Sequence, residues 1–216
     1  MPLAPADPPH GPAWRPGPAL VLRRACAQPY DVHVTRQEKR SLRSARRDLR
    51  RVIAGQRDLD IDGPALAAQV LSVLDAADVQ RGDTVTLYES VPAEPPTAPT
   101  LAALAQRGIR VLLPITLADL DLDWFFADDP QRTAQGRGAI AQARVVLAPG
   151  LAVDTRGGRL GQGGGCYDRA LLRRRPGAAV HVILHPGELL DVGLPTEPHD
   201  QRVDGVITAE GARLVG

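Results

Sequence analysis

Hydrophobic and polar positions along the chain predict helices and strands in alternation. Apolar residues recur at helical intervals from Leu42 to Ile53, and the helical pattern returns further along the chain. Short apolar runs bounded by Gly, Pro or Asp then alternate with further helical stretches. After a first helix that begins at Thr35, the expected helices are 64–77, 97–106 and 167–174, and the expected strands are 84–88, 109–114, 145–149, 179–184 and 203–208.

Strands that alternate with helices predict an α/β fold. We expect a three-layer sandwich with a mostly parallel sheet flanked by helices on both faces. Ligands of such sheets bind at the carboxyl ends of the strands. Glu94, a glycine-rich segment and the residues after Leu184 all follow expected strands, so a binding site is expected at this edge of the sheet.

The first 34 residues differ from the rest of the chain. Seven prolines fall within the first eighteen positions, and no periodicity is visible. Such a segment buries too little apolar surface to offset the entropy of ordering it. We therefore expect residues 1–34 to be a disordered Pro-rich N-terminal extension and residues 35–216 to form a single α/β domain.

Composition narrows the class of protein. The net charge of +1 gives no reason to expect a nucleic-acid partner. The two cysteines, Cys26 and Cys166, have no spacing that suggests a disulfide framework or a zinc site, which is typical of a reducing cytosol. No apolar run is long enough to cross a bilayer, and the N-terminus lacks a signal-peptide pattern. We expect a cytoplasmic protein without a membrane partner.

The first helix is strongly basic. Thr35 and Glu38 have the spacing of a capping box, and one face of the helix is apolar. A solvated charged face is the usual interpretation of its basic side, and a membrane-surface or nucleic-acid helix is the alternative. Lys39 is the single lysine beside twenty-five arginines, which points either to a site that uses its compact ammonium or to chance. The face opposite the apolar one carries Lys39, Arg43, Arg46, Arg47 and Arg50.

The segment GGRLGQGGGCYD, residues 157–168, holds six glycines within nine residues. Glycine lets a backbone approach a bulky anion without a Cβ in the way. An expected strand precedes the segment and an expected helix follows it, which favours a phosphate site over a flexible linker. The residues that would complete a P-loop or a dinucleotide fingerprint are absent.

Four motifs together resemble the 5-formyltetrahydrofolate cyclo-ligase family over about residues 36 to 210. In order, they are KRSLR at 39–43, YESVPAEPPT at 88–97, LAPGLAVDTRGGRLGQGGGCYDRAL at 147–171 and LPTEPHDQRVDGVIT at 194–208. The resemblance implies an ATP- and magnesium-dependent enzyme that forms 5,10-methenyltetrahydrofolate from 5-formyltetrahydrofolate and releases ADP and phosphate. In that family the formyl oxygen attacks the γ-phosphate, N10 attacks the activated carbon, and phosphate leaves.

The resemblance also implies site residues. Glu94 would bind the donors on the pterin edge, and two carboxylates, Asp168 and Asp200, would bind magnesium. Core packing remains the alternative for Trp124, and a helix cap or a turn remains the alternative for each aspartate. Gln162 and Cys166 depart from the residues usual in the family. The implied ATP-binding residues are Lys39, Arg40, Ser41, Leu42, Arg43, Arg159, Leu160, Gly161, Gln162, Gly163, Gly164, Gly165, Cys166 and Tyr167, and the implied substrate-binding residues are Glu89, Glu94, Trp124 and Tyr167.

Two other functions stay open at this point. One is a related ATP-dependent enzyme with a non-folate substrate, and the other is a non-catalytic nucleotide- or RNA-binding protein of the same fold. The expected partners are the small-molecule folate and ATP, and the chain is expected to be a monomer.

Overall fold

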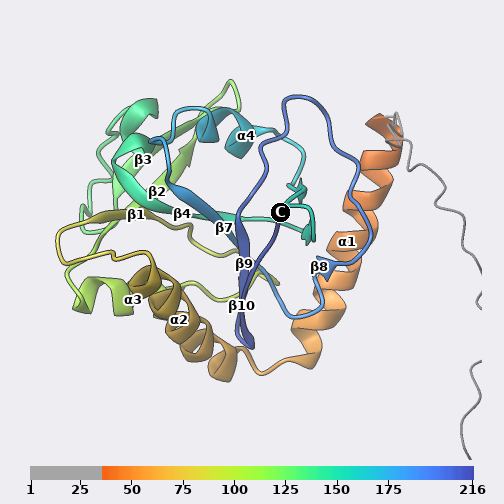
Figure 1. The fold of residues 1–216 in the computed structure, drawn as a ribbon, viewed down its shortest axis with the longest axis horizontal. Coiled ribbons are helices and arrows are strands. Elements are labelled where there is room, and N and C mark those ends of the chain that lie inside the picture. The colour runs from red at the N-terminus through yellow and green to blue at the C-terminus, as the bar shows by residue number, and fades with distance from the viewer. Residues whose placement is uncertain (1–35) are drawn as a thin grey trace, which may run out of the picture. The chain divides into compact units, whose positions relative to one another are not determined.

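A seven-stranded sheet forms the centre of the computed structural model, which describes residues 36–216 (Figure 1). The expected N-terminal extension and the Thr35 cap lie outside the described residues. The five inner strands are parallel, whereas the two edge strands run antiparallel to their neighbours. The strand order is β10 (Gly211–Leu214), β9 (Gly205–Thr208), β7 (Ala179–Ile183), β4 (Ala143–Pro149), β1 (Thr84–Thr86), β2 (Arg110–Thr116) and β3 (Leu122–Phe126).

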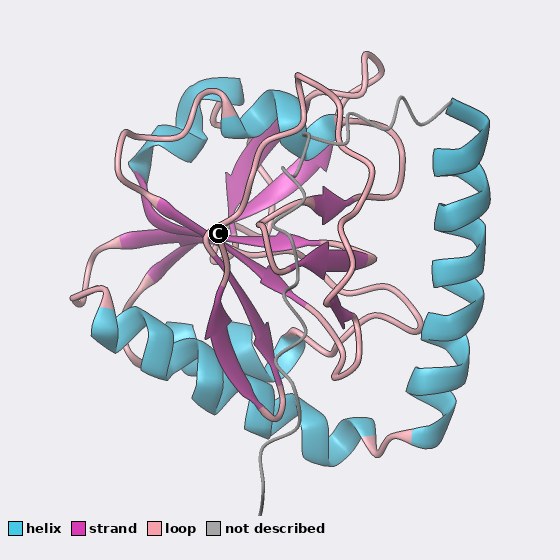
Figure 2. Ribbon diagram, turned by 45° about the vertical axis from the view of Figure 1, so that its right-hand side comes forward, coloured by secondary structure: helices cyan, strands magenta, loops and turns pink. Residues whose placement is uncertain are grey.

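Helices cover both faces of this sheet, as Figure 2 shows. Successive side chains of β4 alternate between two apolar cores, because neighbouring residues of a strand point to opposite faces. Val145 and Leu147 pack with α2 (Leu59–Ala76) and α3 (Ala98–Gln106), and Val146 packs with the 3₁₀ helix η1 (Arg137–Gln142) and α4 (Cys166–Leu171). The expected α/β fold with a mostly parallel sheet is confirmed.

Several element boundaries differ from the sequence-based expectation. Helix α2 begins at Leu59 rather than at Pro64, because the Asp58 carboxylate accepts hydrogen bonds from the backbone N–H groups of Asp60 and Ile61. The edge strands β3 and β10 and a separate small sheet were not predicted. The small sheet has the order β6 (Arg159–Leu160), β5 (Ala152–Asp154), β8 (Leu189–Leu190), and these short strands carry too little periodicity to identify.

Helix α1 (Arg36–Gln56) turns its basic side toward the protein. Lys39 and Arg50 are each 4% exposed, whereas Leu49 and Val52 are 41% and 53% exposed. The interpretation of the basic residues as a solvated face was therefore wrong for Lys39 and Arg50. Their burial is possible because carboxylates from distant parts of the chain neutralise both side chains.

A buried ion pair anchors α1 to the end of the sheet. The Arg50 guanidinium donates to both carboxylate oxygens of Glu188, at 2.7 and 2.6 Å, and also to the carbonyl oxygen of Gly150. Glu188 is 1% exposed and accepts a further hydrogen bond from the backbone N–H of His185. Gly150 follows β4 and Glu188 follows β7, so one arginine joins the helix to the carboxyl ends of two parallel strands.

No helix within residues 36–216 is long and apolar enough to span a membrane.

We expect Glu188→Gln to lower the free energy of unfolding by about 3 kcal/mol, because the buried Arg50 guanidinium would lose its counter-charge. Chemical denaturation followed by circular dichroism measures this loss. Glu210→Gln is the matched control, since Glu210 pairs with Arg57 but its side chain is 65% exposed. The control should lose at most about 0.5 kcal/mol, and equal losses in the two variants would contradict the anchoring role.

Candidate active site

A pocket of about 300 Å³ opens at the carboxyl ends of β2 and β4. Its lining comes from five parts of the chain: the first turns of α1, the hairpin β2–β3, the end of β4 at 149–150, residues 159–168, and residues 195–200. These parts meet because the parallel strands end at this edge of the sheet. This is the edge at which the sequence predicted a ligand site.

Residues 161–165, here called the glycine loop, line the pocket. Gly163 and Gly165 have φ values of +113° and +67°, which residues with a Cβ rarely adopt. Arg43 donates from Nε to the carbonyl oxygen of Gly161 at 3.2 Å, and Arg169 donates from Nη2 to that of Gly164 at 2.7 Å. Basic side chains on both sides therefore fix the carbonyl groups of the loop.

The two glycines at the start of the segment have a structural role instead. A Cβ on Gly157 would lie 2.5 Å from the carbonyl oxygen of Val203, and Gly157 has a φ of +80°. The buried Asp154 carboxylate accepts hydrogen bonds from the backbone N–H groups of Gly158 and Leu194, at 2.8 and 2.6 Å. Gly157 and Gly158 thus let the turn after β5 pack against residues 194–203.

Cationic and anionic side chains are paired inside the pocket. The Lys39 ammonium lies 3.0 Å from Glu197 Oε2 and 2.8 Å from Asp200 Oδ2. Arg159 Nη2 lies 2.8 Å from Asp168 Oδ1. The hydrogen bond from Lys39 holds the pKa of the Glu197 carboxyl below its ordinary value. These pairs balance the pocket's charges, so an anionic ligand has to exchange with carboxylates that are already bound to the cations.

The implied magnesium ligands lie on neighbouring segments. The backbone N–H of Gln201 donates to Asp168 Oδ1 at 3.3 Å, which brings Asp168 next to the segment that carries Asp200. Glu197, His199 and Asp200 can each offer one ligand atom, and these atoms lie within 4.8 Å of one another. Two of these three ligand atoms are carboxylate oxygens, which suit magnesium, and Asp168 is not one of the three.

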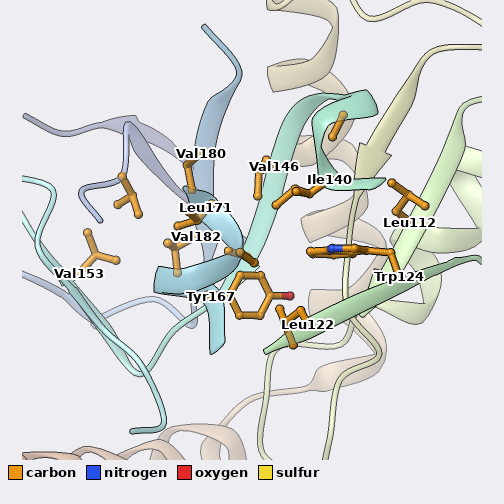
Figure 3. Close-up of a cluster of buried hydrophobic side chains, with 14 of the residues drawn as sticks. Leu112, Leu122, Trp124, Ile140, Val146, Val153, Tyr167, Leu171, Val180 and Val182 are labelled. Atoms are coloured by element: carbon orange, nitrogen blue, oxygen red, sulfur yellow. The ribbon is translucent and has the colours of Figure 1, made fainter. Parts of the chain in front are cut away.

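Tyr167 and Trp124 lie together in the apolar core cluster beneath the pocket, as Figure 3 shows for the cluster. Tyr167 lines the pocket, and its ring meets the Trp124 ring edge-on, with centroids 6.4 Å apart and planes at 85°. Trp124 is fully buried, so core packing, the alternative in the sequence analysis, fits its position. Within residues 36–216 the Tyr167 hydroxyl has no hydrogen-bond partner, and burial raises its pKa.

Other residues implied by the resemblance lie outside the pocket lining. Arg40 and Ser41 are exposed, and Leu42 packs against the core beneath β5 and β6. Glu89 is exposed and pairs with Arg132. Glu94 is nearly buried; its Oε1 lies 4.0 Å from Arg50, and its Oε2 accepts a hydrogen bond from the N–H of Val91.

Sequence reasoning missed several residues that do line the pocket. Glu197 and His199 lie within three positions of Asp200 in the motif LPTEPHD, so their position in the motif was the available signal. Pro114, Thr116 and Leu122 enter through the hairpin β2–β3, whose second strand the hydrophobic pattern did not reveal.

Comparisons with known proteins agree on one family. The model of the 5-formyltetrahydrofolate cyclo-ligase family matches residues 35–209. A protein of Mycolicibacterium smegmatis named 5-formyltetrahydrofolate cyclo-ligase is 37% identical over 144 residues, covering 59% of this chain and 74% of that protein.

Two solved structures are similar in fold, and each is 19% identical to this chain. The 5,10-methenyltetrahydrofolate synthetase of Mycoplasma pneumoniae has a TM-score of 0.65, over 80% of this chain and 99% of that one. The synthetase of Aquifex aeolicus has a TM-score of 0.58, over 80% of this chain and 92% of that one. At this identity the likeness shows the shared fold.

We expect Tyr167→Phe to raise the free energy of unfolding by up to about 1 kcal/mol, because it removes a buried hydroxyl that has no partner. Urea denaturation of the two proteins measures the difference. Thr97→Val is the matched control, since the Thr97 hydroxyl is buried and donates to the carbonyl oxygen of Tyr88 at 2.7 Å. The control should lose about 1 to 2 kcal/mol, and a comparable loss in Tyr167→Phe would show that its hydroxyl is bonded.

Proposed function

The chain belongs to the 5-formyltetrahydrofolate cyclo-ligase family, and on that premise we propose that it converts 5-formyltetrahydrofolate to 5,10-methenyltetrahydrofolate in an ATP-dependent reaction that releases ADP and phosphate. The observation that carries the proposal is the pocket in which Lys39, Arg43 and Arg159 converge on the glycine loop. Three cations around a loop of four glycines and Gln162 suit a polyphosphate.

For the ATP half of the reaction, the protein mainly has to position the phosphates and neutralise their charge. Phosphoryl transfer involves little covalent chemistry for side chains to perform, and charge spreads over the phosphoryl oxygens. Lys39 supplies a compact ammonium, and Arg159, whose side chain is 4% exposed, supplies a rigid guanidinium behind the loop. In the proposal, these groups bind and orient the triphosphate while the glycine loop excludes water from it.

In the proposal, the folate binds against the apolar wall of the pocket. Pro114, Leu122 and Tyr167 offer apolar surface to a flat heterocycle, next to the loop that would hold the γ-phosphate. Burial is the main reason for the raised pKa values of Tyr88 and Tyr167, and the charge of Glu94 adds to both. Glu94 itself lies beside Arg50, and in the proposal its carboxylate would bind the pterin donors.

Magnesium would be held by Asp168 and Asp200. The ion would supply positive charge to the phosphate oxygens when bound. Asp168 and Asp200 are paired with Arg159 and Lys39 in this structure, so both carboxylates would exchange partners when a magnesium-bound nucleotide enters. The cytoplasmic location and the monomeric state expected from the sequence belong to the same proposal.

A related ATP-dependent enzyme with a non-folate substrate is the second candidate. The position of Glu94 favours this candidate, because Glu94 lies outside the pocket lining whereas the residues implied for the phosphates of ATP line the pocket. The RNA-binding alternative loses part of its support, since two of the five residues on the basic side of α1, Lys39 and Arg50, are buried.

Absorbance of the methenyl product tests the proposed activity directly. The protein is mixed with 5-formyltetrahydrofolate, ATP and magnesium, and product is expected only when all three are present. No product above background, with an active family member as the positive control, would rule the activity out. Thermal stabilisation by ATP without any response to folates would instead favour the second candidate.

Two substitutions separate the two halves of the site. Lys39→Ala should raise the KM for ATP by about tenfold or more, because Glu197 and Asp200 would then repel the phosphates without a cation between them. Glu94→Gln should raise the KM for folate about tenfold and leave that for ATP within about twofold. Steady-state kinetics with each substrate varied measure both effects, and a loss confined to folate in both variants would contradict the assignment.

A further inference from the structure

The Lys39 ammonium is almost fully occupied before any ligand arrives. An ammonium has three N–H donors, and two of them point to Glu197 and Asp200 at 3.0 and 2.8 Å. Lys39 is 4% exposed, yet it lines the pocket beside the glycine loop. A phosphate group that binds Lys39 through two oxygens therefore has to displace one of the two carboxylates.

The two carboxylates are held unequally. Asp200 Oδ2 also accepts the backbone N–H of Glu197 at 2.7 Å, and the Asp200 side chain is only 16% exposed. The Glu197 side chain is 34% exposed, and its other neighbour is the largely exposed His199 imidazole, whose Nε2 lies 3.5 Å away. Glu197 can leave Lys39 without breaking the turn that Asp200 stabilises.

We propose that Glu197 is an internal counter-ion that occupies Lys39 in the empty pocket and competes with the phosphates of the nucleotide. This inference rests on the proposed ATP-dependent function and adds a residue that sets the affinity of its nucleotide site. Glu197 opposes nucleotide binding in two ways, because it holds the ammonium and because its charge repels an incoming phosphate. In the empty pocket it keeps Lys39 oriented and neutralised.

The proposal predicts the sign of a substitution. Glu197→Gln keeps the size of the side chain and removes its charge, so it should lower the Kd for ADP about three- to tenfold. A residue that only maintained the pocket, or one that bound the metal with His199 and Asp200, would weaken binding when substituted.

Isothermal titration calorimetry on the full chain, with ADP as the probe, provides the test. One arm contains EDTA and the other contains saturating magnesium. Tighter binding by E197Q is expected in both arms. The gain should be smaller with magnesium, because Asp200 would then leave Lys39 for the metal and free one of its N–H donors. Glu197→Asp, which keeps the charge on a shorter side chain, should fall between the wild type and E197Q and shows whether charge is the cause.

Glu210→Gln is the matched control, since it removes a carboxylate that pairs with Arg57 outside the pocket lining. Its Kd should stay within about twofold of the wild-type value, as expected for an exposed pair. An unchanged or raised Kd in E197Q overturns the inference, and weakening only with magnesium identifies Glu197 as a metal ligand instead. If the wild type bound no ADP in either arm, both the ATP-dependent function and this inference would fail. If it bound ADP normally and E197Q did not tighten, the inference alone would fail.

Discussion

The buried ion pair between Arg50 and Glu188 is the interaction on which the geometry of the site depends. It fixes the long helix α1 across the carboxyl ends of β4 and β7, and the same helix carries Lys39 and Arg43 into the pocket. The carbonyl of Gly150 and the N–H of His185 add hydrogen bonds to this buried pair, and Glu94 Oε1 lies 4.0 Å from Arg50 Nη1. The orientation of the helix, and with it the cationic side of the pocket, follows from this anchor.

Charge balance rather than shape organises the pocket. Lys39 is paired with Glu197 and Asp200, and Arg159 is paired with Asp168. In the proposed function these carboxylates release the two cations when a nucleotide binds. Holding the cations in place before binding reduces the side-chain ordering that binding would otherwise cost. The same pairs make an empty site nearly neutral, so affinity arises from an exchange of partners and not from free positive charge. A ligand with several closely spaced anionic groups is best suited to make that exchange.

The sequence predicted the parallel sheet and the place of the glycine loop at its edge, because both leave local patterns: continuous apolar runs between turn residues, and glycines between a strand and a helix. It did not predict the inward basic face of α1. Polarity along a helix indicates which side is charged, but the carboxylates that bury Arg50 and Lys39 lie 138 and 161 positions away. Trp124 is similar, since an aromatic residue suits a core and a ligand wall equally well until the packing is known.

The exposed side chains of Leu49 and Val52 show that α1 is held only weakly by apolar packing, which affects the order in which the domain unfolds. The helix contributes no side chain to the two large apolar cores on the faces of the sheet, and Leu42 alone joins the small core under β5 and β6. Its attachment is mainly ionic, and it is joined to the rest of the domain at one end of its sequence. Within residues 36–216, α1 is therefore the element expected to detach first, while the sheet and its two cores stay folded. Detachment would carry Lys39 away from the glycine loop, so mild denaturant would abolish activity in a protein that still has its native sheet.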